Sequence, residues 1–163
     1  MSAITVRSPH PSITMSGSIA SEIGQNAPIP SAAMELVLNV RRTANVLDVW
    51  LERVLAPAEL RVAEFNILRI LRGAGAKGHP RPEVERRMVS GADQLTVSVH
   101  RLKARGLVAG VFELRITPAG LALLAELDDT VARAILGLGT GIPEARLRAA
   151  IEVLEEVRRR TGA

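Results

Sequence analysis

The sequence predicts a mainly α-helical protein with one small β-hairpin. Apolar residues make up 47% of the 163 residues, yet only Trp50, Phe65 and Phe112 are aromatic, so the core must be built from Leu, Val, Ile and Ala. From residue 31 onward these aliphatic residues recur every three or four positions, as they do on the buried face of a helix. Glycine and proline interrupt the pattern at intervals and divide it into separate helices.

The first thirty residues have neither helical nor alternating periodicity. They mix Ser, Pro and Gly with isolated isoleucines, and we expect residues 1–30 to form a flexible tail. Its isoleucine and methionine side chains leave a second option, in which the tail docks on a partner subunit. The length of the remaining chain predicts a single domain over residues 31–163.

Two helices are predicted in the first half of the domain. Ser31 can cap a long amphipathic helix that ends before Pro57, and we place this helix at residues 31–56. A second helix follows at residues 61–73 and is stopped by glycine, after which residues 74–82 are predicted to form a loop. The apolar face of the first helix consists of Leu36, Val40, Ala44, Leu47, Leu51 and Val54, and that of the second of Val62, Phe65, Leu68 and Ile70 or Leu71.

A short helix, a turn, another helix and a hairpin are predicted next. Residues 82–89 form the short helix, residues 90–91 the turn and residues 92–105 the following helix, which Gly106 closes. The buried face of this following helix consists of Leu95, Val99 and Leu102. Two β-prone runs that pivot at Gly110 then form a minimal hairpin.

Two more helices complete the predicted domain. Thr117 caps the first, which ends at Gly139, and the second runs from Pro143 to Arg160. Their apolar stripes consist of Leu121, Leu124, Leu127, Val131 and Ile135, and of Leu147, Ile151, Leu154 and Val157. Together with the first helix they carry more apolar surface than one small domain can bury, which predicts a homodimer. The alternative is that these helices fold back on the same subunit as a closed bundle.

The order helix, turn, helix, hairpin is that of a winged helix-turn-helix. A threonine, a leucine, a Gly-Leu-Val sequence and an Ile-Thr-Pro-Ala-Gly sequence follow one another here, at Thr96, Leu102, residues 106–108 and residues 116–120. With these features, and from Met34 to the C-terminus, the chain resembles the MarR family of transcription regulators. The resemblance covers the stretches LAPAELRVAEFNILRILRGAG, VERRMVSGADQLTVSVHRLKARGLV and LRITPAGLALLAEL.

The resemblance implies a winged helix-turn-helix module at residues 57–117 between dimerisation helices at residues 31–56 and 118–163. It implies a transcriptional regulator, a repressor, that binds an inverted repeat in double-stranded DNA as a homodimer. It also implies a small aromatic or acidic effector in the cleft between the dimerisation helices and the module. The residues expected to line that cleft are Thr43, Trp50, Phe65 and Arg69, although Trp50 can equally be a core residue.

The outward face of the helix at residues 92–105 is expected to read DNA, because a helix fits the major groove. Gln94 has the donor and acceptor that bind adenine, and Arg101 can bind guanine or a phosphate. The candidate DNA-contacting residues, including the flank of the helix, the turn and a patch of cations, are Arg86, Arg87, Ser90, Gln94, Thr96, Val97, His100, Arg101, Lys103 and Arg105. The alternative is that this face is the solvated side of an amphipathic helix.

The sequence departs from the family pattern at the helix and at the wing. Val97 stands where typical members have arginine, and the Asp-x-Arg element of the wing is absent from the shortened hairpin. Asp93 adds a negative charge that suits the helix dipole but repels phosphates. We therefore expect either modest DNA affinity or affinity from a phosphate patch, a set of phosphate-facing cations that consists of Arg86, Arg87, Arg101, Lys103 and Arg105. The alternative function is a winged-helix dimer that senses a ligand or binds another protein, with weak or no specific DNA binding.

The residue inventory excludes several other classes. The absence of cysteine excludes disulfides, thiolate zinc sites and thiol redox chemistry. His10, His79 and His100 lack metal-ligand spacing, and no nucleophile elbow or phosphate loop occurs, so we expect no enzyme, metal or cofactor. No apolar run reaches the roughly 18 residues of a membrane span, and no export signal is seen, so we expect a cytoplasmic protein. The net charge of +4 is compatible with a polyanionic partner.

Overall fold

The computed structural model describes residues 18–89 and 93–162, except for the side chain of Asp93. The chain divides into two compact units, Met1–Leu47 and Asp48–Ala163. Helix α2 (Ala32–Leu55) continues across the boundary between them, whereas one domain beginning at residue 31 was predicted.

The first unit contains a short helix that the sequence did not predict. Helix α1 (Ile19–Glu22) lies within the expected tail, and Ile19 is 3% exposed. The hydroxyl of Ser18 accepts a hydrogen bond from the backbone N–H of Ser21 at 3.5 Å, and the carboxylate of Glu22 lies 3.5 Å from the guanidinium of Arg42 in α2. Residues 19–22 of the expected tail are therefore helical, and a cap and a buried isoleucine hold this one turn.

Helix α2 begins where its cap predicts. The backbone N–H of Met34 donates to the hydroxyl of Ser31 at 3.2 Å, which satisfies one of the free donors of the first turn. The helix ends at Leu55, which is fully buried, and the 3₁₀ helix η1 (Ala56–Ala58) turns the chain.

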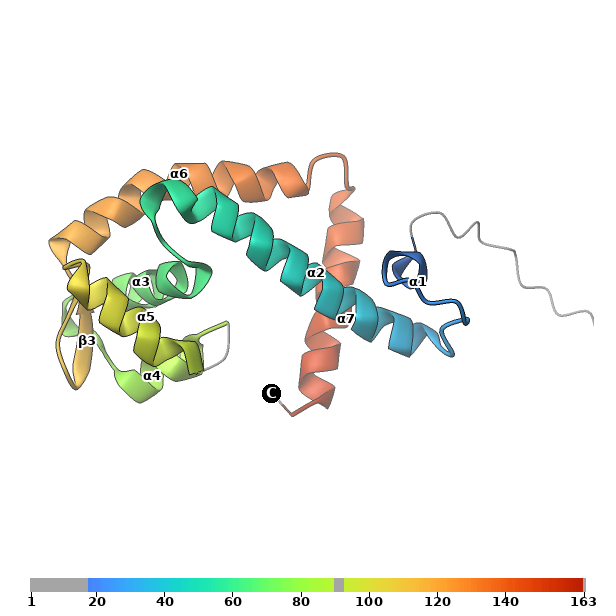
Figure 1. Ribbon diagram of the computed structural model, residues 1–163, viewed down its shortest axis with the longest axis horizontal. Coiled ribbons are helices and arrows are strands. Elements are labelled where there is room, and N and C mark those ends of the chain that lie inside the picture. Colours follow the sequence, from blue (N-terminus) through green and yellow to red (C-terminus); the bar gives the residue numbers. More distant parts are fainter. Residues whose placement is uncertain (1–17, 90–92, 163) are drawn as a thin grey trace, which may run out of the picture. The chain divides into compact units, whose positions relative to one another are not determined.

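The second unit is a winged helix-turn-helix with two further helices (Figure 1). Its elements after η1 are α3 (Val62–Ala74), the 3₁₀ helix η2 (Gly75–Lys77), β1 (His79–Pro80), α4 (Arg81–Arg87), α5 (Asp93–Ala104), β2 (Val108–Ala109), β3 (Glu113–Ile116), α6 (Pro118–Leu138) and α7 (Glu144–Arg160). The three strands form an antiparallel sheet in the order β1-β3-β2. The predicted mainly helical fold class is confirmed.

Strand β1 was expected to be part of a loop. It pairs with β3 so that His79 lies opposite Leu114, and the hairpin pairs Val108 with Ile116. Two residues are too short to show alternation in a sequence, so this strand is visible only through its partner. The pairing gives β3 a neighbour on each side, which fixes the wing at its base.

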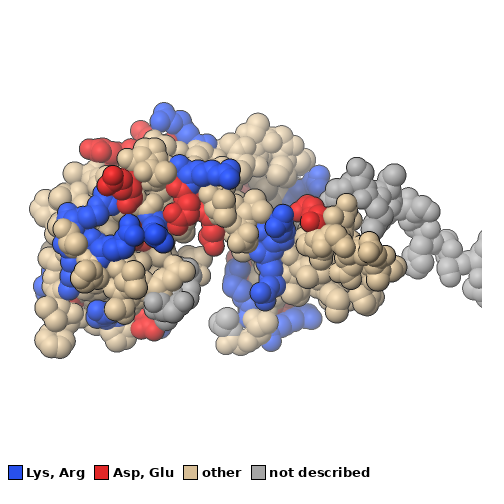
Figure 2. Space-filling model, in the orientation of Figure 1, with Lys and Arg blue, Asp and Glu red and all other residues tan. Residues whose placement is uncertain are grey.

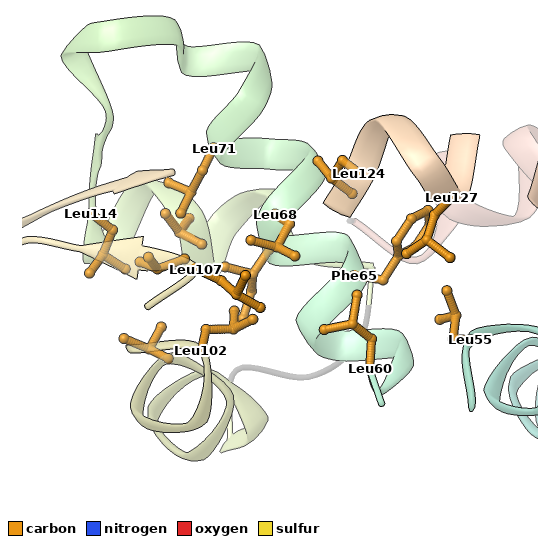
Figure 3. Packing of buried hydrophobic residues seen from close by; sticks show 14 of the residues in the cluster. Leu55, Leu60, Phe65, Leu68, Leu71, Leu102, Leu107, Leu114, Leu124 and Leu127 are labelled. Carbon is orange, nitrogen blue, oxygen red and sulfur yellow. The ribbon is translucent and has the colours of Figure 1, made fainter. Parts of the chain in front are cut away.

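The hydrophobic core surrounds α3 (Figure 3). Leu68 and Leu71 of α3, Leu102 of α5, Leu114 of β3 and Leu124 of α6 are all 0% exposed. Aliphatic side chains from three helices and the sheet therefore meet on one element. Helix α3 is the scaffold against which α5 is positioned.

The apolar stripe of α6 was expected to serve a dimer interface, and part of it does not. Leu124, Leu127 and Val131 pack into the core of the same chain, whereas Leu121 and Ile135 are 43% and 49% exposed. In α7 no residue is buried. Of these two helices, the ends of the α6 stripe and the whole of α7 are thus left at least partly exposed.

Candidate nucleic-acid interface

Helix α5 has a buried face and an exposed face as predicted. Leu95, Val99 and Leu102 are buried against the core. The exposed residues that were named as DNA contacts on this helix are Gln94, Thr96, Val97 and His100, whereas Lys103 and Arg101 are half-buried. Ser90, which was named with them, lies outside the described residues. The fold thus presents four of the candidates on one element.

Arg101 does not point freely outward, because a carboxylate of α3 holds it. Its Nε lies 2.7 Å from Oε1 of Glu64, whose side chain is 1% exposed. The contact is an ion pair whose angle falls outside that of a hydrogen bond, since Oε1 has no hydrogen-bond partner among the described residues. The Arg101 side chain remains 42% exposed. The same guanidinium that was expected to bind guanine or phosphate therefore also neutralises a buried charge.

Glu64 also fixes the start of α3. Its Oε2 accepts a hydrogen bond from the backbone N–H of Arg61 at 3.0 Å, as in a capping box. Next to it, Oε1 of Glu52 in α2 accepts from the backbone N–H of Val62 at 3.1 Å. A cavity of about 370 Å³ lies between α3 and α5, lined by Glu52, Arg61, Ala63, Glu64, Gln94, Val97, Ser98 and Arg101.

Glu64 was not predicted as a site residue. It lies in the run VAEFNIL, four residues before Leu68 and seven before Leu71, and so belongs to the same buried face of α3. The spacing of Glu64 from these two leucines could have identified it as a buried carboxylate. A carboxylate on a buried helical face requires a cation, and Arg101 supplies it.

Two cations of the predicted phosphate patch share one carboxylate. Glu83 in α4 accepts from Nη2 of Arg86 at 2.8 Å and also from Nε of Arg87. These hydrogen bonds, first from Arg86 and then from Arg87, lower the pKa of the Glu83 carboxyl below its ordinary value. The carboxylate therefore stays charged at neutral pH and offsets part of the positive charge.

Arg105 and Arg81 bind within the protein as well. The two terminal nitrogens of Arg105 donate to the backbone carbonyls of Glu59 at 2.8 Å and Ala58 at 3.0 Å. Nη2 of Arg81 donates to the hydroxyl of Thr96 at 3.0 Å. Figure 2 shows cationic and acidic side chains interleaved over this module rather than a continuous basic surface. Most of the arginines near α5 are thus already partnered in the DNA-free protein.

The wing is a short hairpin with a tightly fitted base. The Thr117 hydroxyl donates to the carbonyl of Gly106 at 2.7 Å and accepts from the N–H of Gly120 at 3.1 Å, which caps α6 as predicted. Gly120 lies so close to the hairpin that a Cβ there would meet the carbonyl oxygen of Leu107 at 2.4 Å. The Ile-Thr-Pro-Ala-Gly sequence therefore joins the wing to α6.

The predicted effector-lining residues are only partly brought together. Phe65 and Arg69 line one cavity of about 270 Å³ between α3 and α6, with Asp128, Val131, Ala132 and Ile135. The guanidinium carbon of Arg69 lies 5.7 Å from the centroid of the Phe65 ring. Trp50 is half-buried and does not line this cavity, and Thr43 is exposed in the other unit.

The acidic and basic side chains that line this cavity differ in whether they form an ion pair. Asp128 is half-buried and pairs with Nη1 of Arg72 at 2.6 Å. Arg69 has no carboxylate partner among residues 18–89 and 93–162. Its side chain is therefore the cation available to a ligand in this cavity.

Within the described ranges, no helix is both long and apolar enough to cross a bilayer. Over the same residues, no group of three or more acidic or histidine side chains is arranged to hold a metal ion.

No family model matches the sequence, and no curated protein matches it. Solved structures do match the fold. A MarR-family regulator from Silicibacter pomeroyi is 20% identical, with a TM-score of 0.71 over 79% of this chain and 94% of its own. CouR from Rhodococcus jostii RHA1, solved with p-coumaroyl-CoA, is 20% identical, with a TM-score of 0.67 over 79% of this chain and 95% of its own.

A third match is BpsR from Bordetella bronchiseptica, whose DNA binding is regulated by 6-hydroxynicotinic acid. It is 20% identical, with a TM-score of 0.70 over 82% of this chain and 99% of its own. At this level of identity the likeness is one of fold, and it extends over nearly the full length of each of these regulators. The chain therefore has the winged helix-turn-helix fold of the MarR-family transcriptional regulators.

Proposed function

We propose that the protein is a DNA-binding transcriptional regulator that binds an inverted repeat as a homodimer and acts as a repressor. The observation that carries the proposal is the exposed face of α5, with Gln94, Thr96, Val97 and His100, on a helix whose opposite face is fixed in the core. An α-helix held this way can enter the major groove and present its side chains to base edges. The shared fold with DNA-binding regulators supports the same conclusion.

The test is a fluorescence titration with DNA fragments selected from random duplexes, repeated at several salt concentrations. We expect a selected inverted repeat and an affinity that falls steeply as salt rises, because phosphate contacts release counterions. The Gln94→Ala variant should lose discrimination at one base pair while keeping the salt dependence. Failure to select any sequence would contradict the proposal.

A second function is supported by the charge pairing around α5. Arg86, Arg87 and Arg101 face carboxylates, and Arg105 faces backbone carbonyls. Such a surface also suits a winged-helix dimer that senses a ligand or binds a protein, with weak DNA binding. The titration separates the two, because this second function predicts that no sequence is selected and that any binding is weak and similar for all duplexes.

We further propose that the effector is a small aromatic acid held in the cavity between α3 and α6. Phe65 supplies an aromatic wall and Arg69 a cation for a carboxylate. Two fold relatives are described with p-coumaroyl-CoA and with 6-hydroxynicotinic acid. Such a ligand would weaken DNA binding by favouring a conformation that does not fit the operator.

Arg69→Ala provides the test of this effector site. We expect operator binding as in the parent protein and a loss of release by aromatic acids, measured by titrating a panel of hydroxylated benzoic and nicotinic acids into the DNA complex. Arg133→Ala is the matched control, because Arg133 is exposed on α6 and does not line the cavity. Equal release of the two variants would exclude Arg69 as the ligand's partner.

A further inference from the structure

Two large apolar side chains stand exposed at the tip of the wing. Phe112 is 86% exposed and Val111 is 71% exposed. Phe112 is one of only three aromatic residues in the chain, and the other two are half-buried or buried. The fold therefore presents a scarce aromatic ring to solvent at a place where neither packing nor solubility favours it.

The tip is held rigidly by the hairpin beneath it. Gly110 has a φ of 95°, and a Cβ there would lie 1.8 Å from the carbonyl oxygen of Glu113. Leu114, two residues after Phe112, is fully buried, and β3 is paired on both sides. Phe112 therefore stands between a constrained glycine and a strand that is paired on both sides.

The charge around the tip permits the approach of a polyanion. The only carboxylate at the tip is that of Glu113, and Nη2 of Arg115 lies 2.6 Å from it. The pair leaves no net negative charge beside the ring. Leu107 comes three residues after the end of α5, and its N–H donates to the carbonyl of Leu102 at 2.9 Å, so only a short segment joins the proposed reading helix to the wing.

The size of the apolar tip favours DNA over a protein partner. A stable protein interface buries about 800 Å² on each side, far more than two side chains provide. A single apolar side chain is enough to enter a base step from the minor groove, unstack it and kink the duplex. Phe112, an exposed ring on the hairpin that follows the proposed reading helix, has the properties of such a wedge.

We infer that Phe112 is an apolar wedge that enters the minor groove beside the bases read by α5 and partly unstacks one base step. This inference rests on the proposed DNA binding. It assigns to the shortened wing a contact with the bases and a deformation of the DNA. The operator should accordingly favour a flexible pyrimidine–purine step at the position of the wing.

The experiment uses the full-length protein and the duplexes that it selects from random DNA. The duplexes carry 2-aminopurine at successive positions outside the major-groove half-sites, and its fluorescence reports unstacking. Three proteins are compared: the parent, Phe112→Ala and the conservative variant Phe112→Leu. Since Phe112 is so exposed, we expect both variants to unfold at the parent's thermal midpoint, which separates a binding effect from a folding effect.

We expect the parent protein to raise the fluorescence at one position beside each half-site. Phe112→Ala should bind about tenfold more weakly and lose the signal, because one stacked ring contributes roughly that factor. Phe112→Leu should retain most of both, since leucine is also an effective wedge.

Three results would overturn the inference in different ways. Unchanged affinity and signal in Phe112→Ala, with the parent still binding its selected duplexes, would exclude the wedge and leave the proposed function intact. A parent protein that selects no duplex would remove the proposed function and the wedge together. Loss of self-association in Phe112→Ala, measured by sedimentation, would instead assign the tip to a protein contact and also contradict the wedge.

Discussion

At the scale of single residues, the arginines near α5 are held by protein groups before any DNA is present. Glu83 holds two of them, and its lowered pKa shows that the charged form is favoured. With a lowered pKa, the stabilising contribution of this carboxylate is complete at neutral pH and is lost only as the pH falls below the ordinary carboxyl range. Protonation therefore does not release Arg86 and Arg87 under ordinary conditions, and a phosphate must displace the carboxylate.

We predict that Glu83→Gln strengthens DNA binding by roughly tenfold at low salt and makes the salt dependence steeper by about one to two phosphate contacts. The removed charge no longer competes with phosphates for Arg86 and Arg87. Titrations at several salt concentrations provide the measurement. Glu85→Gln is the matched control, because Glu85 is exposed on the same helix and forms no ion pair within the described chain. Equal gains in both variants would mean that only net charge matters.

We predict that removing the cation of the Glu64–Arg101 pair destabilises the protein more than removing its carboxylate. Arg101→Met leaves a carboxylate that is 1% exposed without a cation, and we expect a loss of about 2 kcal/mol of unfolding free energy. Glu64→Gln leaves an arginine that can turn to solvent and keeps an acceptor for the N–H of Arg61, so we expect a loss of about 1 kcal/mol. Urea denaturation measures both losses, and the opposite order would contradict this account.

At the scale of elements, the contact between the wing and α6 depends on a glycine. The Cβ of an alanine at position 120 would press on the carbonyl of Leu107 and on Ile116, so we predict that Gly120→Ala destabilises the protein by about 2 kcal/mol. Gly137→Ala in the same helix meets nothing within 4 Å and should stabilise it by about 0.5 kcal/mol. Thermal and urea unfolding give both values. A shared sign for the two variants would refute the close approach.

The same elements show which parts of the fold could be predicted from the sequence. Helices α2, α3, α5 and α6 were predictable because their apolar spacing and caps are local, and the caps at Ser31 and Thr117 are confirmed. Strand β1 was not predictable, since its two residues acquire a structure only by pairing with Leu114 and Glu113, more than thirty positions away. Helix α1 was missed because one turn is too short to show a period.

For the candidate site, the sequence predicted which face of α5 is exposed but not what its arginines contact. Arg101 meets Glu64, and Arg105 meets the carbonyl of Glu59, across large separations along the chain. Periodicity assigns a side chain to a face and contains no information about a partner on another helix. The roles of Gln94, Val97 and the other named residues in DNA binding stay predictions.

At the scale of the whole molecule, exposed apolar residues recur along α2, α6 and α7. Val37 and Leu47 in α2, Leu136 in α6 and Ile151 in α7 are each more than two-fifths exposed. Exposed aliphatic residues that recur along helices indicate an interface with another copy or another protein. The proposed homodimer would cover them.

We predict that Ile151→Asp converts the dimer into a monomer, because a carboxylate would be desolvated in the interface. Ala149→Asp introduces the same side chain on the opposite side of α7 and should leave the dimer intact. Sedimentation velocity at several concentrations gives the result for each variant. A parent protein that is monomeric at all concentrations would disprove the dimer.

The two hydrogen bonds of Arg105 have a mechanical consequence. They tie the C-terminal end of α5 to residues 58 and 59, while Glu52 ties the last turns of α2 to the first residue of α3. These hydrogen bonds connect the C-terminal turns of α2 to α3. They also connect the C-terminal end of α5 to the segment between α2 and α3. A displacement of the last turns of α2 would therefore change the tilt of α5, the helix that we propose to read DNA.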